Sequence, residues 1–486
     1  MSKVLADLKP QSLWHFFEDI CNIPHPSKKE EKIISYVKSF GEELQLETIV
    51  DHAGNILIRK AATPGYENRK TVVLQSHLDM VPQKNNDTEH DFEKDPIKVF
   101  VDQDWVKANG TTLGADNGIG VAAAMAVLKS TDIEHGPIEC LFTIDEETGM
   151  TGAFALKEGL LKGDILINLD SEDEGELYIG CAGGIDTTAY FDFTTTSTVG
   201  ALHAFEIQVK GLKGGHSGLD IHLGRGNANK IMNRILWHAH KEMQLQLAHI
   251  EGGSLRNAIP REAAAKVVLP MENKERFERF IEESLIDIKN ELKNVEPDLV
   301  INIHEIPLPD EVINPEVTSR LLNGIYGCPN GVIRMVDDMP GVVETSTNLA
   351  IIKSASNKIE VSSLQRSSVD SAKTDLCNMI HSVFEMAGAK VEHSGSYPGW
   401  KPNASSPILQ TMKQVYNEKF GKTPEVKVIH AGLECGILGG VYPNLDMISF
   451  GPTIRNPHSP DEKVNIKTVG LFWDFLVATL ESIPDK

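Results

Sequence analysis

The sequence predicts an α/β protein with more than one domain. In the first and last parts of the chain, short strands that are apolar along almost their whole length alternate with helices, which is typical of a sheet covered on both faces. In the middle part, residues 187–395, strands of alternating polarity and charged helices indicate a separate α+β unit with a half-exposed antiparallel sheet. The chain has 486 residues, whereas a single hydrophobic core usually stops growing at about 250–300 residues.

The predicted elements begin with helices and pass into strands. Apolar residues at three- and four-residue steps predict helices between residues 11 and 46, broken at the sequence IPHPSKKE. The apolar strands of the first part are expected at 55–59, 71–75, 138–144 and 165–169. A helix at about 118–129 separates the second strand from the third. The middle part contains predicted strands at 189–193 and 205–209 and helices at 227–242 and 272–294. The last part contains a helix from 406, strands at 426–429 and 447–450, and a final amphipathic helix.

Composition excludes several classes of protein. Lysine and arginine total 47 against 69 aspartate and glutamate, a formal charge of −22, which disfavours a protein that binds nucleic acid through its phosphates. The six cysteines are far apart and form no CxxC pair, so we expect reduced thiols in the cytosol. Charged residues interrupt the first 20 residues, unlike a signal peptide, and the most apolar helix is too short to cross a bilayer. We therefore expect a cytoplasmic protein without a membrane segment.

Polar residues that could bind metal follow the first apolar strands. His77 and Asp79 come directly after a strand, two residues apart, so their side chains project from one face. Asp116 stands in a Gly-rich turn before a helix of small residues. Taken singly, His-x-Asp is a weak signal, and Asp116 could be a helix N-cap.

Three further groups extend this pattern. Asp145, Glu146 and Glu147 end another apolar strand, where clustered carboxylates need cations or protons unless the loop is solvated. Asp170 ends the strand DILINLD, before an acidic loop. His458 lies far downstream in the Pro-bounded loop NPHSPDE and would by itself pass as a surface histidine. Because ligands often bind outside the carboxyl ends of strands, we expect these groups to meet.

Together the two histidines and the carboxylates form a nitrogen and oxygen set that suits Zn²⁺, Co²⁺ or Mn²⁺. Five ligands are too many for one tetrahedral ion. They fit two ions about 3.5–4 Å apart that share one bridging carboxylate, as in aminopeptidase-type hydrolysis. Asp79 and Glu146 are then left as carboxylates that do not bind metal. One of them can orient the histidine, and the other can take a proton from water.

The motifs SHLDMVP, LGADNGIG, DEETGMTGA, NLDSEDEGE, GGHSG and NPHSPDE resemble the dinuclear-zinc peptidase superfamily of carnosinases and carboxypeptidases, and within it the bacterial aminoacyl-histidine dipeptidases, over essentially the whole chain. The resemblance implies that Asp116 is the bridge, that Asp170 binds the first metal and that Glu147 binds the second. It adds the motif histidine His77 and the distal histidine His458 as metal ligands. Asp79 and Glu146 match the two catalytic carboxylates of the family.

The resemblance also implies an architecture: a mixed-sheet α/β/α zinc-peptidase catalytic domain formed by residues 1–186 and 396–486, with an α+β lid or dimerisation domain, residues 187–395, inserted. Within this lid, His216 matches the histidine that binds the carbonyl oxygen or oxyanion. Asn257, Arg256 and Arg366 are our candidates for binding the free carboxylate of a substrate, for which arginine offers a bidentate fork. Gly432 and Glu434 are candidates for lining the pocket near the free amino group.

We expect a metallodipeptidase that hydrolyses unblocked dipeptides, including Xaa-His and β-alanyl-His. Two divalent ions, with Zn²⁺ the first choice and Co²⁺ or Mn²⁺ as alternatives, would polarise the scissile carbonyl and activate a shared water, whose proton Glu146 accepts. We expect small peptides as partners, no nucleic acid and no membrane, with a homodimer as a candidate assembly. Two alternatives remain: an N-acyl amino acid deacylase on the same scaffold, and a metal-dependent binding protein, which would have no use for Glu146.

Overall fold

The computed structural model describes residues 4–486, which form two compact units. The first unit comprises the chain up to Gly180 together with Trp400–Val428 and Leu433–Lys486, and the second comprises Cys181–Gly399 and Ile429–Gly432. The predicted boundaries were 186/187 and 395/396, and the short return of the chain into the second unit at 429–432 has no counterpart in that prediction. That the second unit serves as a lid or a dimerisation domain stays a prediction.

The first unit contains an eight-stranded mixed sheet in the order β1-β2-β6-β3-β7-β23-β8-β22. Its strands are β1 (Glu47–Val50), β2 (Ile56–Lys60), β3 (Val72–His77), β6 (Ile138–Thr143), β7 (Ile165–Asn168), β8 (Glu176–Cys181), β22 (Glu425–Ile429) and β23 (Asp446–Ser449). β3 runs parallel to β6 and β7, and β7 runs parallel to β23. Every residue of β3, β6 and β7 is buried, so this part of the sheet is covered on both faces.

Helices cover this sheet, as the alternating pattern predicted. They are α1 (Gln11–Cys21), α2 (Glu31–Glu43), α3 (Ala115–Lys129), α4 (Glu146–Gly149), α5 (Thr151–Ala155), α10 (Pro407–Phe420), α11 (Glu434–Val441) and α12 (Ile466–Glu481). α3 consists mainly of small and aliphatic residues and is buried almost throughout, packing against α1 and β3. The mixed α/β fold class is therefore confirmed.

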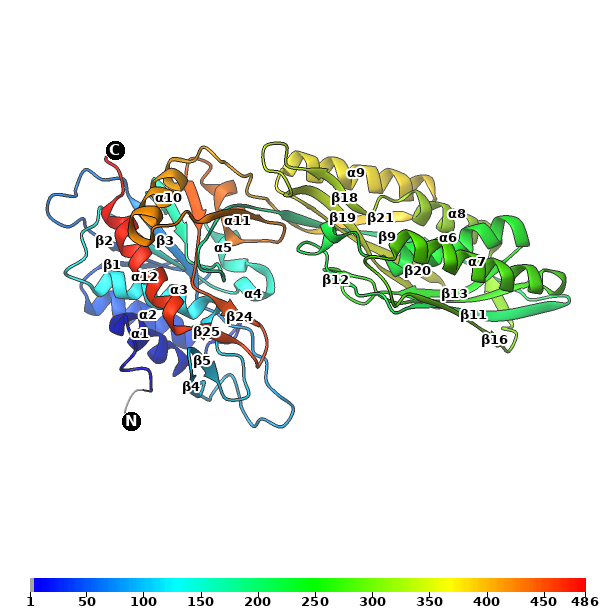
Figure 1. The fold of residues 1–486 in the computed structure, drawn as a ribbon, viewed down its shortest axis with the longest axis horizontal. Coiled ribbons are helices and arrows are strands. Elements are labelled where there is room, and N and C mark those ends of the chain that lie inside the picture. Colours follow the sequence, from blue (N-terminus) through cyan, green and yellow to red (C-terminus); the bar gives the residue numbers. More distant parts are fainter. Residues whose placement is uncertain (1–3) are drawn as a thin grey trace. The chain divides into compact units, whose positions relative to one another are not determined.

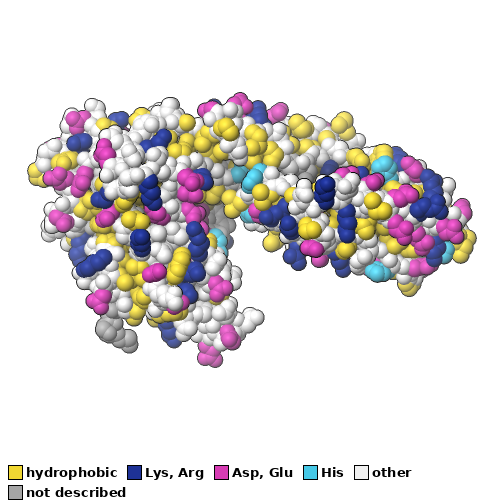
Figure 2. Space-filling model, viewed as in Figure 1, with side chains coloured by type: hydrophobic (Ala, Val, Ile, Leu, Met, Phe, Trp, Pro, Cys, Tyr) yellow, Lys and Arg dark blue, Asp and Glu magenta, His cyan; other side chains and the backbone are white. Residues whose placement is uncertain are grey.

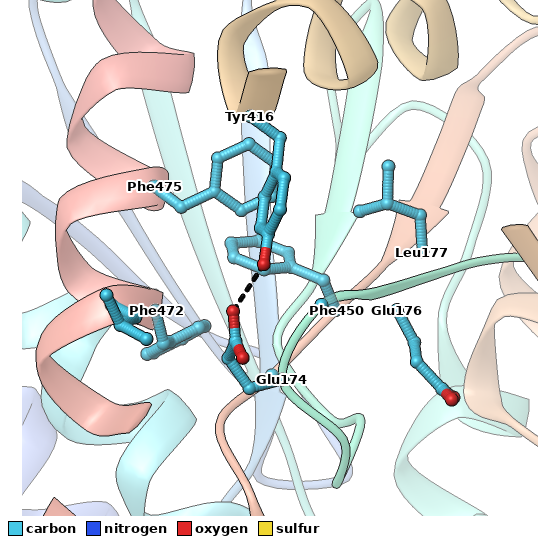
Figure 3. A pocket seen from close by; sticks show the side chains of 10 residues that line it. Glu174, Glu176, Leu177, Tyr416, Phe450, Phe472 and Phe475 are labelled. Carbon is cyan, nitrogen blue, oxygen red and sulfur yellow. Dashed lines mark hydrogen bonds between the residues drawn. The ribbon is translucent and has the colours of Figure 1, made fainter. Parts of the chain in front are cut away.

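An aromatic cluster packs the C-terminal helices α10 and α12 against the sheet (Figure 3). Tyr416 of α10 and Phe450 after β23 both pack against Phe475 of α12, with ring centroids 5.0 and 5.1 Å apart. The Tyr416 hydroxyl donates a hydrogen bond to Glu174, so its polar end is satisfied while its ring is buried.

A small four-stranded sheet, β24-β25-β5-β4, positions the C-terminal loop of the first unit. Its strands are β4 (Val99–Asp102), β5 (Trp105–Ala108), β24 (Ile454–Arg455) and β25 (Lys463–Asn465). β24 and β25 flank the loop that contains His458, and β25 pairs antiparallel with β5. This pairing joins segments more than 350 residues apart, which no local pattern predicted.

The second unit is a nine-stranded antiparallel sheet with helices packed against it, as expected of an α+β unit (Figure 1). Its strands are β9 (Gly183–Asp192), β11 (Leu202–Lys210), β13 (Gln246–Gly252), β15 (Ala263–Pro270), β16 (Val300–Ile306), β18 (Gly331–Met335), β19 (Val343–Ser354), β20 (Lys358–Ser367) and β21 (Lys390–Tyr397). Its helices are α6 (Ala228–Met243), α7 (Lys274–Leu292), α8 (Pro315–Gly327) and α9 (Asp370–Met386). The short elements are β10 (Thr195–Ser197), β12 (Gly215–His216), β14 (Ala258–Ile259), β17 (Glu311–Ile313), η1 (Ile221–Leu223) and η2 (Met271–Asn273).

Surface and thiol features agree with the composition. Acidic and basic side chains are interspersed over the face shown in Figure 2, so the net charge of −22 does not form one acidic field there. All six cysteines are buried, and no disulfide links any of them within residues 4–486. None of the helices in this part of the chain combines the length and the apolar character needed to span a bilayer.

Candidate dinuclear metal centre

Strand ends and one loop of the first unit bring the five predicted ligands together. His77 is the last residue of β3, Glu147 lies in α4 just after β6, and Asp170 follows β7. Asp116 lies at the start of α3, and His458 lies in the loop between β24 and β25. Because β3, β6 and β7 are parallel, their carboxyl ends meet at one edge of the sheet.

Two groups of three side chains share Asp116. In the first group His77 Nε2 lies 3.2 Å from Asp116 Oδ1 and 3.4 Å from Asp170 Oδ1. In the second group His458 Nε2 lies 3.1 Å from Asp116 Oδ2 and 2.9 Å from Glu147 Oε2. In each group, one donor atom per residue lies within 4.8 Å of the others. The two oxygens of Asp116 therefore face different groups, which is the geometry of a bridging carboxylate.

Two simpler interpretations, a helix N-cap at Asp116 and a solvated loop at 145–147, are both wrong. The residue that precedes α3 is Gly114, and the side-chain hydrogen bonds that the Asp116 carboxylate makes in the described part of the chain are with His77 and His458. The run 145–147 is not a solvated loop, because Asp145 is buried and accepts hydrogen bonds from Thr148 and Thr151.

The electrostatics of this cluster favour the binding of cations. Burial raises the pKa of Asp170 to about 7 and also raises the pKa of Glu147. Hydrogen bonds to Asp116 and Glu147 raise the pKa of His458 to about 11. Two buried carboxylate oxygens, Glu147 Oε1 and Asp170 Oδ1, accept no hydrogen bond within the described chain. Buried carboxylates with unused lone pairs beside two imidazoles are a donor set that fits divalent ions.

Asp79 is built to orient its neighbours. Its Oδ1 lies 3.3 Å from His77 Nδ1 and accepts the N–H of Glu146 at 2.9 Å. Its Oδ2 accepts the N–H of Glu147 at 3.2 Å and the hydroxyl of Ser27 at 2.7 Å. Burial opposes ionisation of Asp79, but the hydrogen bonds from His77, Glu146 and Ser27, together with the charge of His77, outweigh it and lower the pKa of Asp79. A carboxylate on the second nitrogen of a metal-binding histidine fixes the ring and its tautomer.

Glu146 is placed beside the cluster, and its surroundings favour the protonated form. Burial raises the pKa of Glu146 well above its ordinary value, and the charges of Asp170 and Glu147 add to this shift. His77, Glu146 and Glu147 also offer donor atoms within 4.8 Å of one another. The geometry alone therefore permits Glu146 either to bind metal or to act as a base.

The second unit gathers the remaining predicted residues around Arg366. Arg366 Nε donates to the Ser217 hydroxyl at 3.3 Å, and its Nη1 donates to the Tyr397 hydroxyl at 3.0 Å. The N–H of Ser217, the neighbour of His216, donates to the carbonyl of Asn257 at 2.8 Å. A Cβ at Gly432 would lie 3.1 Å from the Tyr397 ring.

Two of the other candidates are engaged elsewhere. Arg256 forms an ion pair with Asp186 at 2.6 Å, which already uses its charge. Glu434 is fully buried in the first unit, where its Oε2 accepts hydrogen bonds from Gln75 at 2.6 Å and Thr143 at 2.7 Å. Burial raises its pKa to about 7.

His216 is held as a neutral hydrogen-bond donor. Its Nδ1 accepts the N–H groups of Gly218 at 3.1 Å and Leu219 at 3.0 Å, which leaves the proton of the neutral ring on Nε2. Burial and the charge of Arg366 lower its pKa to about 4, so the ring is uncharged at neutral pH.

Comparison with known proteins decides the family. Residues 73–482 match the model of peptidase family M20/M25/M40. The chain belongs to this family. It is 48% identical over 482 residues to the cytosol non-specific dipeptidase of Escherichia coli (strain K12), with 99% of each chain covered. The crystal structure of aminoacylhistidine dipeptidase from Vibrio alginolyticus matches with a TM-score of 0.94 and 52% identity over 99% of this chain and 98% of that one. An aminopeptidase from Bacillus cereus shares the fold, with a TM-score of 0.58 and 16% identity over 98% and 99% of the two chains.

Sequence reasoning missed several residues that hold the predicted site residues of this M20 peptidase. In the first unit Ser27 donates to Asp79, and Gln75 and Thr143 donate to Glu434 of α11. In the second unit the Tyr397 hydroxyl accepts a hydrogen bond from Arg366. Gln75 precedes His77 by two residues on the same strand, so strand alternation places both side chains on one face and could have indicated it. Ser27 and Tyr397 stand in no motif, and only the tertiary fold brings them to their partners.

Proposed function

We propose that this M20 peptidase is a metal-dependent dipeptidase that hydrolyses unblocked dipeptides, including Xaa-His and β-alanyl-His, in the cytoplasm. The single observation that carries the proposal is Asp116, whose two oxygens face two separate groups of ligand side chains. The near full-length similarity to a cytosol non-specific dipeptidase and to an aminoacylhistidine dipeptidase supports the substrate class.

In this proposal His77, Asp116 and Asp170 hold one ion, and Asp116, Glu147 and His458 hold the other. Imidazole nitrogens and carboxylate oxygens suit Zn²⁺, and Co²⁺ or Mn²⁺ would also fit. When bound, the two ions would polarise the scissile carbonyl as Lewis acids and lower the pKa of the attacking water.

Individual side chains would carry out proton transfer, orientation of His77, oxyanion stabilisation and substrate binding. Glu146 would take the proton of the attacking water and return it to the leaving amine, for which its position beside His77 and Glu147 suits it. Asp79 keeps the His77 ring oriented. His216 donates its Nε2–H to the developing oxyanion. Arg366 pairs with the terminal carboxylate of the dipeptide, with Asn257 and Gly432 beside it, and this ion pair selects substrates that have a free C-terminus.

A substrate panel tests the proposal. Xaa-His dipeptides, β-alanyl-His, tripeptides and N-acetylated amino acids are offered to the enzyme as isolated, after chelation, and after metal is added back. We expect cleavage of the free dipeptides, loss of activity after chelation and recovery with metal. Preferential cleavage of the N-acetylated amino acids would instead identify a deacylase, and activity that survives chelation with no metal left would contradict the metal centre.

A further inference from the structure

Glu462 is a buried carboxylate that the reaction scheme above does not use. It lies four residues after His458, and its side chain is 2% exposed. Its Oε2 accepts the N–H groups of Leu113 at 2.7 Å and Gly114 at 3.0 Å. Its Oε1 accepts the N–H groups of Ala115 at 2.8 Å and Asp116 at 3.3 Å. One carboxylate thus binds four consecutive N–H groups of the turn that leads to Asp116.

The burial of the Glu462 carboxylate has a free-energy cost, which its hydrogen bonds to the turn must offset. Burying a carboxylate is unfavourable, and it is more so beside another carboxylate such as Asp116. Within residues 4–486 no lysine or arginine forms an ion pair with Glu462, so backbone N–H groups supply its stabilisation. Four charge-assisted hydrogen bonds to adjacent residues hold the turn in one conformation.

The same side chain connects two ligands from opposite ends of the chain. Glu462 belongs to the loop of His458, between β24 and β25, while its four donors belong to the turn of Asp116. His458 and Asp116 are themselves 3.1 Å apart. Movement of either segment against the other would change the distance between the bridging carboxylate and the distal histidine.

We propose that Glu462 is a positioning residue that sets the bridging carboxylate: it holds the Asp116 turn against the His458 loop so that each oxygen of Asp116 faces one ion. The proposal rests on the metal ligands assigned under the proposed function. If Glu462 only stabilised the fold, its replacement would lower stability without changing metal binding. The proposal instead predicts weaker binding of the second ion, the one assigned to Asp116, Glu147 and His458, and weaker coupling between the two ions.

Glu139 provides a matched control. It is also 2% exposed and accepts two backbone N–H groups, those of Lys162 at 2.8 Å and Gly163 at 3.0 Å, together with Arg59. It lies near the start of β6, whereas the candidate metal centre lies at the opposite, carboxyl end of that strand. Its replacement should therefore affect stability without affecting the ions.

The experiment compares Mn²⁺-loaded wild type, Glu462→Gln and Glu139→Gln as full-length proteins. Metal analysis gives the stoichiometry, calorimetry gives the two dissociation constants, and electron paramagnetic resonance reports exchange coupling between Mn²⁺ ions that share a bridge. Glutamine keeps the volume but presents an amide N–H to backbone N–H groups. We expect Glu462→Gln to weaken binding of the second ion at least tenfold and to lose most of the exchange-coupled signal. We expect Glu139→Gln to retain both the affinity for the second ion and the coupled signal.

The outcomes separate the two proposals. An unchanged second dissociation constant and an unchanged coupled spectrum in folded Glu462→Gln would overturn the role of Glu462 and leave the metal centre intact. A wild-type protein without a coupled Mn²⁺ pair would overturn the metal centre and this inference with it. If Glu462→Gln does not fold, the same measurements on Glu462→Asp, which keeps the charge but shortens the side chain, decide the question by the same criteria.

Discussion

Glu146 stands one residue before a proposed metal ligand, so its assignment as a base is the residue assignment that most needs a test. If it only moves protons, Glu146→Gln should retain both ions while kcat falls by about 10²–10⁴. Metal analysis of the purified variant beside steady-state kinetics checks this. Loss of one ion from Glu146→Gln would make Glu146 a ligand, a role that its grouping with His77 and Glu147 permits geometrically.

His216 should titrate well below neutral pH. Burial and Arg366 lower its pKa from 6.5 to about 4 in the folded protein. Between these values the unfolded chain binds the proton and the folded one does not, so the contribution of His216 to stability is present above about pH 6.5 and is lost as the pH falls toward 4. Nuclear magnetic resonance of the His216 ring should show a midpoint near pH 4. A midpoint at or above 6.5 would mean that a charged ring faces Arg366.

At the scale of residues, the sequence singled out most of the side chains that the structure groups together, because each candidate ligand except His458 stands at or near the end of an apolar strand or in a Gly-rich turn, where short-range patterns are strong. The orienting contacts could not be predicted in the same way. Ser27 reaches Asp79 from 52 positions away, and Glu462 reaches the Asp116 turn across more than 340. The identity of such partners depends on tertiary packing.

The turn that carries His216 is sterically confined. A Cβ at Gly218 would lie 1.9 Å from the carbonyl oxygen of His430, and the Gly218 N–H is one of the two donors to His216 Nδ1. Gly218→Ala must therefore move this turn. Since removal of an oxyanion donor costs about 10²–10³ in kcat, we expect kcat to fall at least tenfold with the metal content unchanged.

Gly327→Ala is the control, because a Cβ there meets only the Val383 side chain at 3.6 Å. Normal kcat in Gly218→Ala would show that the turn tolerates displacement and would remove His216 from the catalytic step.

At the scale of elements, the uniformly apolar strands of the first unit were predictable, whereas one short hairpin was not. β3, β6 and β7 are buried on both faces, and their apolar runs stand out in the sequence. The hairpin of β4 and β5 escaped prediction because it is short and partly exposed and is completed by β25 from the far end of the chain.

At the scale of the whole molecule, the ions should stabilise the fold as well as serve catalysis. A ligand held at 100 times its dissociation constant stabilises the native state by about 2.7 kcal/mol, and chelation also leaves the buried carboxylates facing one another. We expect chelation to lower Tm by several degrees and added Zn²⁺ to restore it, as measured by calorimetry. An unchanged Tm in protein shown to be metal-free would contradict structural coupling of the centre.

The two-unit organisation was predictable in outline because the middle of the chain differs in polarity pattern from its ends. The segment 429–432 was not, since four residues that pass into the other unit leave no trace in composition or periodicity. Assembly into a homodimer stays a prediction.

The central claim is that two ions share Asp116 while Glu146 binds neither. The most direct test is a crystal structure of the Zn²⁺-loaded protein with anomalous diffraction data at the zinc edge. We expect two anomalous peaks about 3.5–4 Å apart, one beside each oxygen of Asp116, with Glu146 outside both coordination spheres. A single peak, or a peak coordinated by Glu146 in place of Glu147, would contradict it.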